Sequence, residues 1–125
     1  MELMRKIINL SVRPLKDFPG YYITREGEIL KEDKNGKFKK IQGFATKKNE
    51  WRVNLKGKDG KYTTKQVHTL VYTHFKLDNH DANDIGYFQR LDNKLVFLDD
   101  NFKNCNINNL ITVKELKEFY LKNKK

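Results

Sequence analysis

The stretch that decides the fold runs from Leu95 to Leu110 and reads LVFLDDNFKNCNINNL. It begins with four apolar residues, which is the length and composition of a short strand. The following residues are rich in Asp and Asn, whose side chains hydrogen-bond to nearby backbone and stabilise loops. Thr112 and Glu115 then form a capping-box pattern, which predicts the start of a helix. The order expected here is therefore strand, Asn-rich loop, second strand and helix.

The spacing of this stretch resembles the signature of the phage HNH homing endonucleases, approximately N-H-I-D-G-N-x-x-N-N-x-x-x-N-L. Asp99, Asn101, Asn104, Asn109 and Leu110 match it without a gap. The resemblance implies a ββα-metal unit at the C-terminal end of the chain. It also implies that the four polar matches shape the loop.

The same resemblance implies that the catalytic residues are lost. The family places its general-base histidine where this chain has Phe97, and metal ligands where it has Val96 and Leu116. We therefore expect no nuclease activity and no cofactor; a divalent cation such as Mg²⁺ would be needed only if cleavage persisted. A displaced site that uses His68 with Asp99 remains an alternative.

A second resemblance covers the first part of the chain. Residues 19–24, PGYYIT, and 27–29, GEI, resemble the small modular domain that often accompanies HNH motifs in phage homing endonucleases and that is taken to help DNA binding. The β-forming residues on both sides of Gly27 predict two short strands around a tight turn.

The middle of the chain predicts a hairpin followed by a helix. Residues 51–55 alternate apolar and polar side chains, and residues 58–61 read as a turn before a return strand. Residues 67–75 carry apolar side chains at helical spacing, so we expect a core helix. We expect His68 to be satisfied within the fold, with a ligand or DNA contact as the alternative, and His74 to be partly buried. Residues 76–94 are expected to be an acidic, solvated loop with a short turn near residues 85–88, because polar residues and Gly86 dominate there.

These patterns give an α+β fold class. We expect a small antiparallel sheet or hairpin part, one central helix, and a C-terminal degenerate ββα unit. The expected division is a basic β-rich module at residues 1–65 and the HNH-like unit at residues 66–125, with residues 76–94 as an insertion.

The charge distribution favours a polyanionic partner. The chain has 125 residues and a formal net charge of +10, and residues 1–65 carry 17 Lys and Arg against 8 Asp and Glu. A run of surface lysines can also be simple solvation in a Lys- and Asn-rich chain. The residues expected to contact DNA are Lys37, Lys39, Lys40, Lys47, Lys48, Trp51, Arg52, Lys56, Lys58 and Lys61.

The expected function is therefore that of a catalytically inactive HNH-like phage protein that binds DNA without sequence specificity. One alternative is a protein-binding phage component, either a virion protein or an effector against a host enzyme, suggested by the apolar residues Ile85, Tyr87 and Phe88. A less favoured alternative is an active DNA nickase.

No apolar run is long enough to span a bilayer and no secretory signal is evident, so we expect no membrane partner. We expect the cytoplasm of a bacterial host, or the virion under the protein-binding alternative, and a single cysteine fits a reducing compartment.

Overall fold

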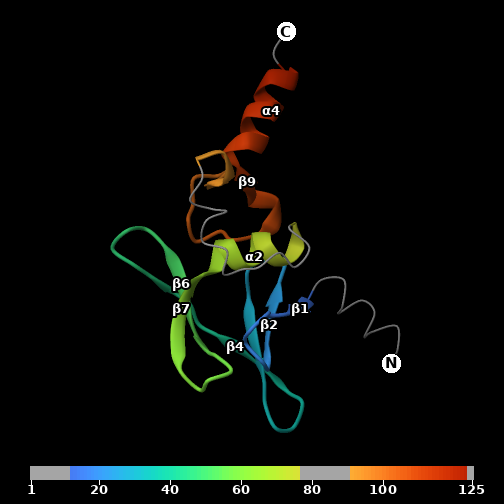
Figure 1. Cartoon of the computed structure of the whole chain (residues 1–125), viewed down its shortest axis with the longest axis vertical. Coiled ribbons are helices and arrows are strands. Elements are labelled where there is room, and N and C mark those ends of the chain that lie inside the picture. The colour runs from blue at the N-terminus through green and yellow to red at the C-terminus, as the bar shows by residue number, and fades with distance from the viewer. Residues whose placement is uncertain (1–11, 77–90, 124–125) are drawn as a thin grey trace, which may run out of the picture.

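The computed structural model describes residues 12–76 and 91–123 of the chain, and these residues form an α+β fold with three small antiparallel sheets (Figure 1). The first sheet has the order β1 (Val12–Pro14), β2 (Tyr21–Thr24), β3 (Ile29–Glu32) and β4 (Phe38–Ile41). The second has the order β5 (Phe44–Ala45), β6 (Trp51–Lys56) and β7 (Tyr62–Gln66). The third pairs β8 (Leu95–Phe97) with β9 (Leu110–Thr112). The helical elements of the described residues are α2 (Val67–Phe75), α4 (Val113–Asn123) and the 3₁₀ turns η1 (Leu91–Asn93) and η2 (Ile107–Asn109).

The hairpins follow from the turn residues that the sequence places between β-forming runs. Gly27, between β2 and β3, has φ of +87°, a conformation that costs an L side chain free energy. Asp59 and Gly60 occupy the turn between β6 and β7, where the Asp59 carboxylate accepts a hydrogen bond from the Lys61 amide at 3.0 Å. The strands predicted on both sides of each turn are confirmed. The strand β1 and the edge strand β4 were not predicted individually.

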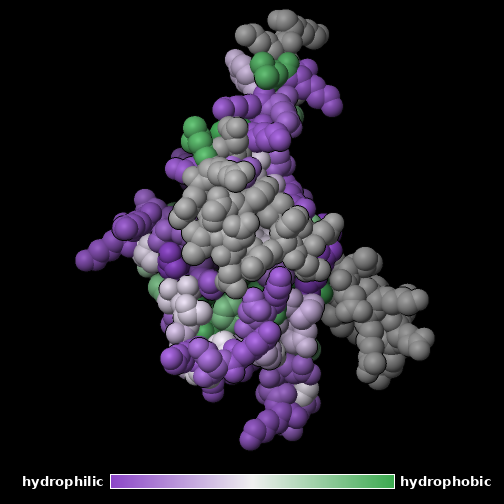
Figure 2. Space-filling view, in the orientation of Figure 1, coloured by the Kyte–Doolittle hydropathy of each residue, from purple (hydrophilic) through white to green (hydrophobic). Residues whose placement is uncertain are grey.

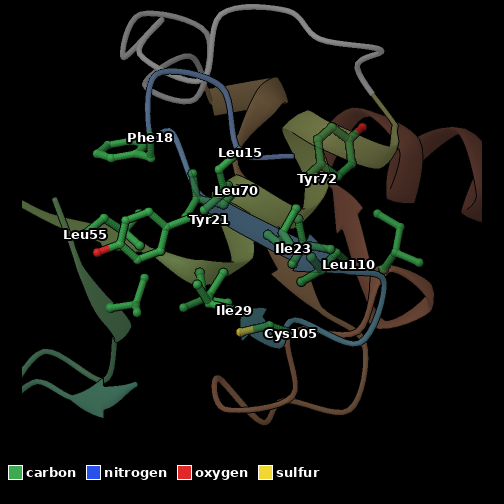
Figure 3. Packing of buried hydrophobic residues seen from close by; sticks show 14 residues of the cluster. Leu15, Phe18, Tyr21, Ile23, Ile29, Leu55, Leu70, Tyr72, Cys105 and Leu110 are labelled. Carbon is green, nitrogen blue, oxygen red and sulfur yellow. The ribbon is translucent and has the colours of Figure 1, made fainter. Parts of the chain in front are cut away.

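One buried cluster connects the sheets to α2, whose Val67, Leu70 and Val71 are at most 2% exposed. These side chains lie among residues of both hairpin sheets and of the C-terminal loop (Figure 3). Residues of both predicted parts, 1–65 and 66–125, therefore share one core. Burial of apolar area at about 25 cal/mol per Å² is the main stabilising contribution of such a cluster.

His74 lies inside this core and joins α2 to the segment after β1. Its Nδ1 donates to the Leu70 carbonyl at 2.8 Å, and its Nε2 accepts from the Lys16 amide at 3.1 Å. The sequence predicted a partly buried residue, whereas the side chain is 1% exposed and bonded at both ring nitrogens. Because burial disfavours the charged ring, the pKa of His74 lies below its usual value.

The C-terminal helix α4 begins at the predicted capping box. The Thr112 Oγ1 accepts from the Glu115 amide at 3.1 Å, and the Glu115 Oε1 accepts from the Thr112 amide at 3.3 Å. The helix then projects from the rest of the molecule (Figure 1). Phe119, Tyr120 and Leu121 are 63%, 67% and 67% exposed. The visible surface is mainly hydrophilic, with a small hydrophobic spot near the end of this helix (Figure 2).

Two sets of sequence predictions concern residues 77–90, which lie outside the described residues. They are the turn near residues 85–88, with Ile85, Tyr87 and Phe88, and most of the acidic, solvated loop predicted for residues 76–94. Within the part of the chain that the structure describes, no helix is both long and apolar enough to cross a membrane.

Candidate nucleic-acid interface and the C-terminal loop

The Asp/Asn-rich loop is organised around the Asp99 carboxylate. Its Oδ1 accepts from the Asn101 amide and from Asn109 Nδ2, and its Oδ2 accepts from Asn104 Nδ2, each at 2.8 Å. The Asn109 side chain, 8% exposed, also accepts from the Asp99 amide at 3.0 Å and donates to the Asn104 carbonyl at 2.9 Å. The four residues expected to shape the loop are thus brought together in one hydrogen-bond network. The bond from Asn104, with smaller contributions from Asn101 and Asn109, lowers the pKa of Asp99.

The loop is attached to the first sheet by a close backbone approach. The Ile107 amide donates to the Arg25 carbonyl at 2.8 Å. A Cβ on Gly27 would lie 2.8 Å from the Cβ of Cys105, so only glycine fits there without a shift. Burial raises the pKa of the Cys105 thiol to about 12, which keeps this sulfur a neutral packing group.

Phe97, at the position of the family's general base, packs against the core and against His68. The two ring centroids are 5.1 Å apart with an interplanar angle of 55°. Val96 precedes Phe97 on β8, so strand alternation directs its side chain to the opposite face. Leu116 lies on α4 and is 37% exposed. The structure therefore brings Phe97 and His68 together and does not place Val96 on the same face.

The residues present do not fit the divalent cation that the HNH resemblance implies. The three positions at issue carry apolar side chains, and both carboxylate oxygens of Asp99 already accept hydrogen bonds within the loop. Among residues 12–76 and 91–123, no group of three or more His, Cys, Asp and Glu side chains could hold a metal ion.

His68, the alternative base, is held in a neutral state by its surroundings. Burial is the main reason that its pKa falls to about 4; the Arg52 charge lowers it further, and Glu50 acts in the opposite direction. The prediction that this ring is satisfied within the fold is wrong for Nδ1, which is buried without a hydrogen-bond partner. The displaced site would also require Asp99 as a partner. The hydrogen bonds that the Asp99 carboxylate accepts come from Asn101, Asn104 and Asn109 and not from His68.

The lysines expected to contact DNA lie on the hairpin turns and nearby strand ends, and all are exposed. We call them the turn lysines: Lys37, Lys39, Lys40, Lys47, Lys48, Lys56, Lys58 and Lys61. The β3–β4 and β6–β7 turns lie at the end of the molecule opposite α4, and the β5–β6 turn projects to one side (Figure 1). Two turn lysines form exposed ion pairs, Lys40 with Glu28 at 3.4 Å and Lys58 with Asp17 at 3.6 Å. Such exposed pairs contribute little to stability and leave the positive potential largely available.

Trp51 and Arg52 differ in their surroundings from the turn lysines. Trp51 is half-buried on the inner side of the second sheet, where a Cβ on Gly43 would lie 2.5 Å from its Nε1. The Arg52 Nε contacts the Glu50 carboxylate at 3.2 Å, and its Nη1 donates to Thr64 at 3.3 Å. Trp51 thus serves packing, whereas Arg52 is held on the outer face.

The outer face of the second sheet was only partly anticipated from the sequence. Strand alternation and the observed register place on it Phe44, Arg52, Asn54, Lys56, Tyr62, Thr64 and Gln66. Phe44 is 38% exposed and Tyr62 is 67% exposed. The alternation of residues 51–56 contained the signal for Arg52, Asn54 and Lys56. The position of Phe44 on this face could be inferred only from the register of β5 against β6, and local periodicity does not predict that register.

Comparison with known proteins adds no relative. No protein-family model matches the chain, and no curated protein and no solved structure gives a significant match.

Proposed function

We propose that this protein binds DNA through the turn lysines and does not cleave it. The observation that carries the proposal is that eight exposed lysines lie on the hairpin half of a protein with a net charge of +10. Lysine ammonium groups neutralise phosphates and release counterions, which provides affinity with no base information. The binding is therefore expected to be salt-dependent and tolerant of sequence.

We propose that the protein does not cleave DNA because the side chains of the C-terminal unit cannot perform the chemistry. A benzyl group at residue 97 cannot accept a proton from water, and losing a general base typically costs about 10²- to 10⁴-fold in rate. We propose that the unit is an HNH-derived scaffold of phage origin, in which the Asp99 network and the packing of Phe97 on His68 maintain the architecture.

Binding is tested by fluorescence anisotropy with a labelled duplex and charge-matched variants. The variant Lys37→Gln/Lys47→Gln/Lys61→Gln removes one lysine from each of the β3–β4, β5–β6 and β6–β7 turns. The control Lys94→Gln/Lys114→Gln/Lys122→Gln removes the same charge from the C-terminal unit. We expect about 10-fold or greater weakening for the first variant, since exposed phosphate contacts add to affinity. Equal weakening by both variants would mean that only net charge matters, and would contradict the proposed surface.

Cleavage is tested by incubating the protein with supercoiled plasmid and Mg²⁺ or Mn²⁺, with EDTA as the control. We expect the plasmid to remain supercoiled. Reproducible metal-dependent nicking that is lost in His68→Ala or Asp99→Ala would overturn the non-cleaving part of the proposal and favour the nickase alternative.

Protein binding is the second candidate, because α4 exposes Phe119, Tyr120 and Leu121 on a projecting helix. Under this alternative, a phage has reused the scaffold as a virion component or as an effector against a host protein. Co-purification from infected cells tests it. A partner retained by the wild type and lost in Phe119→Lys/Tyr120→Lys, with DNA binding absent, would select this function over the first.

A further inference from the structure

We infer that the outer face of the second sheet binds single-stranded DNA by stacking unpaired bases on Phe44 and Tyr62. This inference rests on the proposed DNA-binding function and specifies the form of DNA that the protein prefers. The two rings belong to the edge strands β5 and β7, on either side of the central strand β6.

The exposure of the rings is the first argument. Phe44 is 38% exposed and Tyr62 is 67% exposed, although they lie on a sheet whose other face is buried by Val53 and Leu55 at 0% exposure. Aromatic side chains on an open sheet surface are the usual platform for bases, because every base has a π-face and stacking does not depend on sequence. In a duplex, those base faces are already covered by neighbouring base pairs.

The spacing of the rings is the second argument. Phe44 lies in register with Arg52, and Tyr62 with Lys56, four residues further along β6. With a rise of about 3.4 Å per residue and about 4.8 Å between strands, the two positions are about 17 Å apart. Each ring therefore takes a separate base of one strand, and the nucleotides between them pass over β6.

The groups between and beside the rings suit a polyanion with exposed base edges. Lys56 provides positive charge on the face, and Asn54 provides an amide donor and acceptor. Arg52 forms an ion pair with Glu50 and donates to Thr64, so its planar guanidinium is held on the same face. Lys47 and Lys48 follow β5 at one end of the sheet, and Lys58 and Lys61 lie in the turn at the other end. Lysines therefore lie at both ends of the aromatic face, where they can contact the phosphates of the bound DNA strand.

The test measures anisotropy with labelled dT oligonucleotide, the matching rU oligonucleotide and a duplex. For Phe44→Ala/Tyr62→Ala, we expect weaker dT binding by about 10-fold or more per ring and duplex binding changed by less than about 3-fold. Tyr120→Ala is the matched control, since Tyr120 is also 67% exposed but lies on α4. Tyr62→Phe should retain dT binding, and Phe44→Leu/Tyr62→Leu should lose it while keeping apolar contacts and the melting temperature.

Three outcomes would overturn the inference: wild-type dT affinity in both double variants, wild-type preference for the duplex, or tighter binding of rU than of dT. If the lysine variant of the hairpin turns still weakens duplex binding in those cases, the proposed DNA-binding function stands and only the stacking mode fails. If the wild-type protein binds neither dT nor duplex at low salt, both proposals fail together.

Discussion

Glu115 is the residue through which the C-terminal helix is attached to the core. Besides closing the capping box with Thr112, its Oε1 accepts a hydrogen bond from the Tyr72 hydroxyl on α2. Its Oε2 lies 3.8 Å from the Lys76 ammonium, which also donates to the Leu110 carbonyl at 2.9 Å. Burial raises the pKa of Glu115, but the hydrogen bonds from Tyr72 and Thr112 outweigh it, so the net pKa is lowered.

The prediction at this residue is that Glu115→Ala lowers the free energy of unfolding by about 1–3 kcal/mol, because it removes a cap and the hydrogen bond from the Tyr72 hydroxyl. Urea denaturation followed by circular dichroism measures the change. Glu118→Ala, at an exposed position of the same helix, should change stability by less than about 0.5 kcal/mol. Equal effects of the two variants would contradict the attachment.

His68 makes the stability of the folded protein depend on pH, and the direction of this dependence follows from its pKa. Its folded pKa of about 4 lies below the unfolded value of 6.5, so the unfolded chain binds the proton more readily. The contribution of this neutral ring to the free energy of unfolding is fully present above pH 6.5. It is lost progressively as the pH falls toward 4, because the unfolded chain takes up the proton first.

We predict that His68→Leu reduces this loss by about 2 kcal/mol between roughly pH 7 and pH 4.5, since one pKa unit corresponds to about 1.4 kcal/mol. At neutral pH the variant should be as stable as the wild type or slightly more stable, because it removes a buried Nδ1 that has no hydrogen-bond partner. Thermal melts at several pH values measure both effects. Parallel plots of melting temperature against pH for the wild type and the variant would contradict the lowered pKa of His68.

At the scale of elements, the hairpin turns both define the sheets and present the turn lysines. Gly27 and Gly60 have similar positive φ values, +87° and +80°, but different surroundings. Gly27 meets Cys105, whereas nothing lies within 4 Å of a Cβ built on Gly60. The pair therefore separates the cost of the backbone conformation from the cost of the close approach.

We predict that Gly60→Ala costs about 1–2 kcal/mol for the left-handed conformation alone. Gly27→Ala should cost about 1–3 kcal/mol more, because the Asn-rich loop must move away from the β2–β3 turn. Chemical denaturation of the two variants gives the comparison. Equal losses would show that the loop does not depend on this contact.

The elements that could be predicted from sequence are those determined by local pattern. The turn residues, the helical spacing of residues 67–75 and the capping box were sufficient for the β2–β3 and β6–β7 hairpins, α2 and the start of α4. The inward position of Trp51 follows from the same alternation that places Arg52 outward, although Trp51 was expected to contact DNA. The pairing of Phe97 with His68 was not predictable, because it arises from a contact between residues distant in the chain. Short-range periodicity contains no information on which strands become neighbours.

At the scale of the whole molecule, the basic hairpin half and the projecting helix α4 lie at opposite ends (Figure 1). One shared core holds the two ends together, so the proposed DNA-binding surface and a helix with exposed apolar side chains coexist on one scaffold. The HNH-like character of the C-terminal unit remains a prediction from its motif. The proposed DNA-binding role depends on the charge and exposure of the hairpins and not on that resemblance.

The most direct test of this account is the salt dependence of duplex DNA binding by the wild-type protein. If the turn lysines contact phosphates, a plot of log K against log salt concentration should be linear, with a slope of about −3 or steeper, because each contact contributes about 0.9 to the slope. The account predicts that result. Binding that is independent of salt, or no binding at low salt, would contradict it.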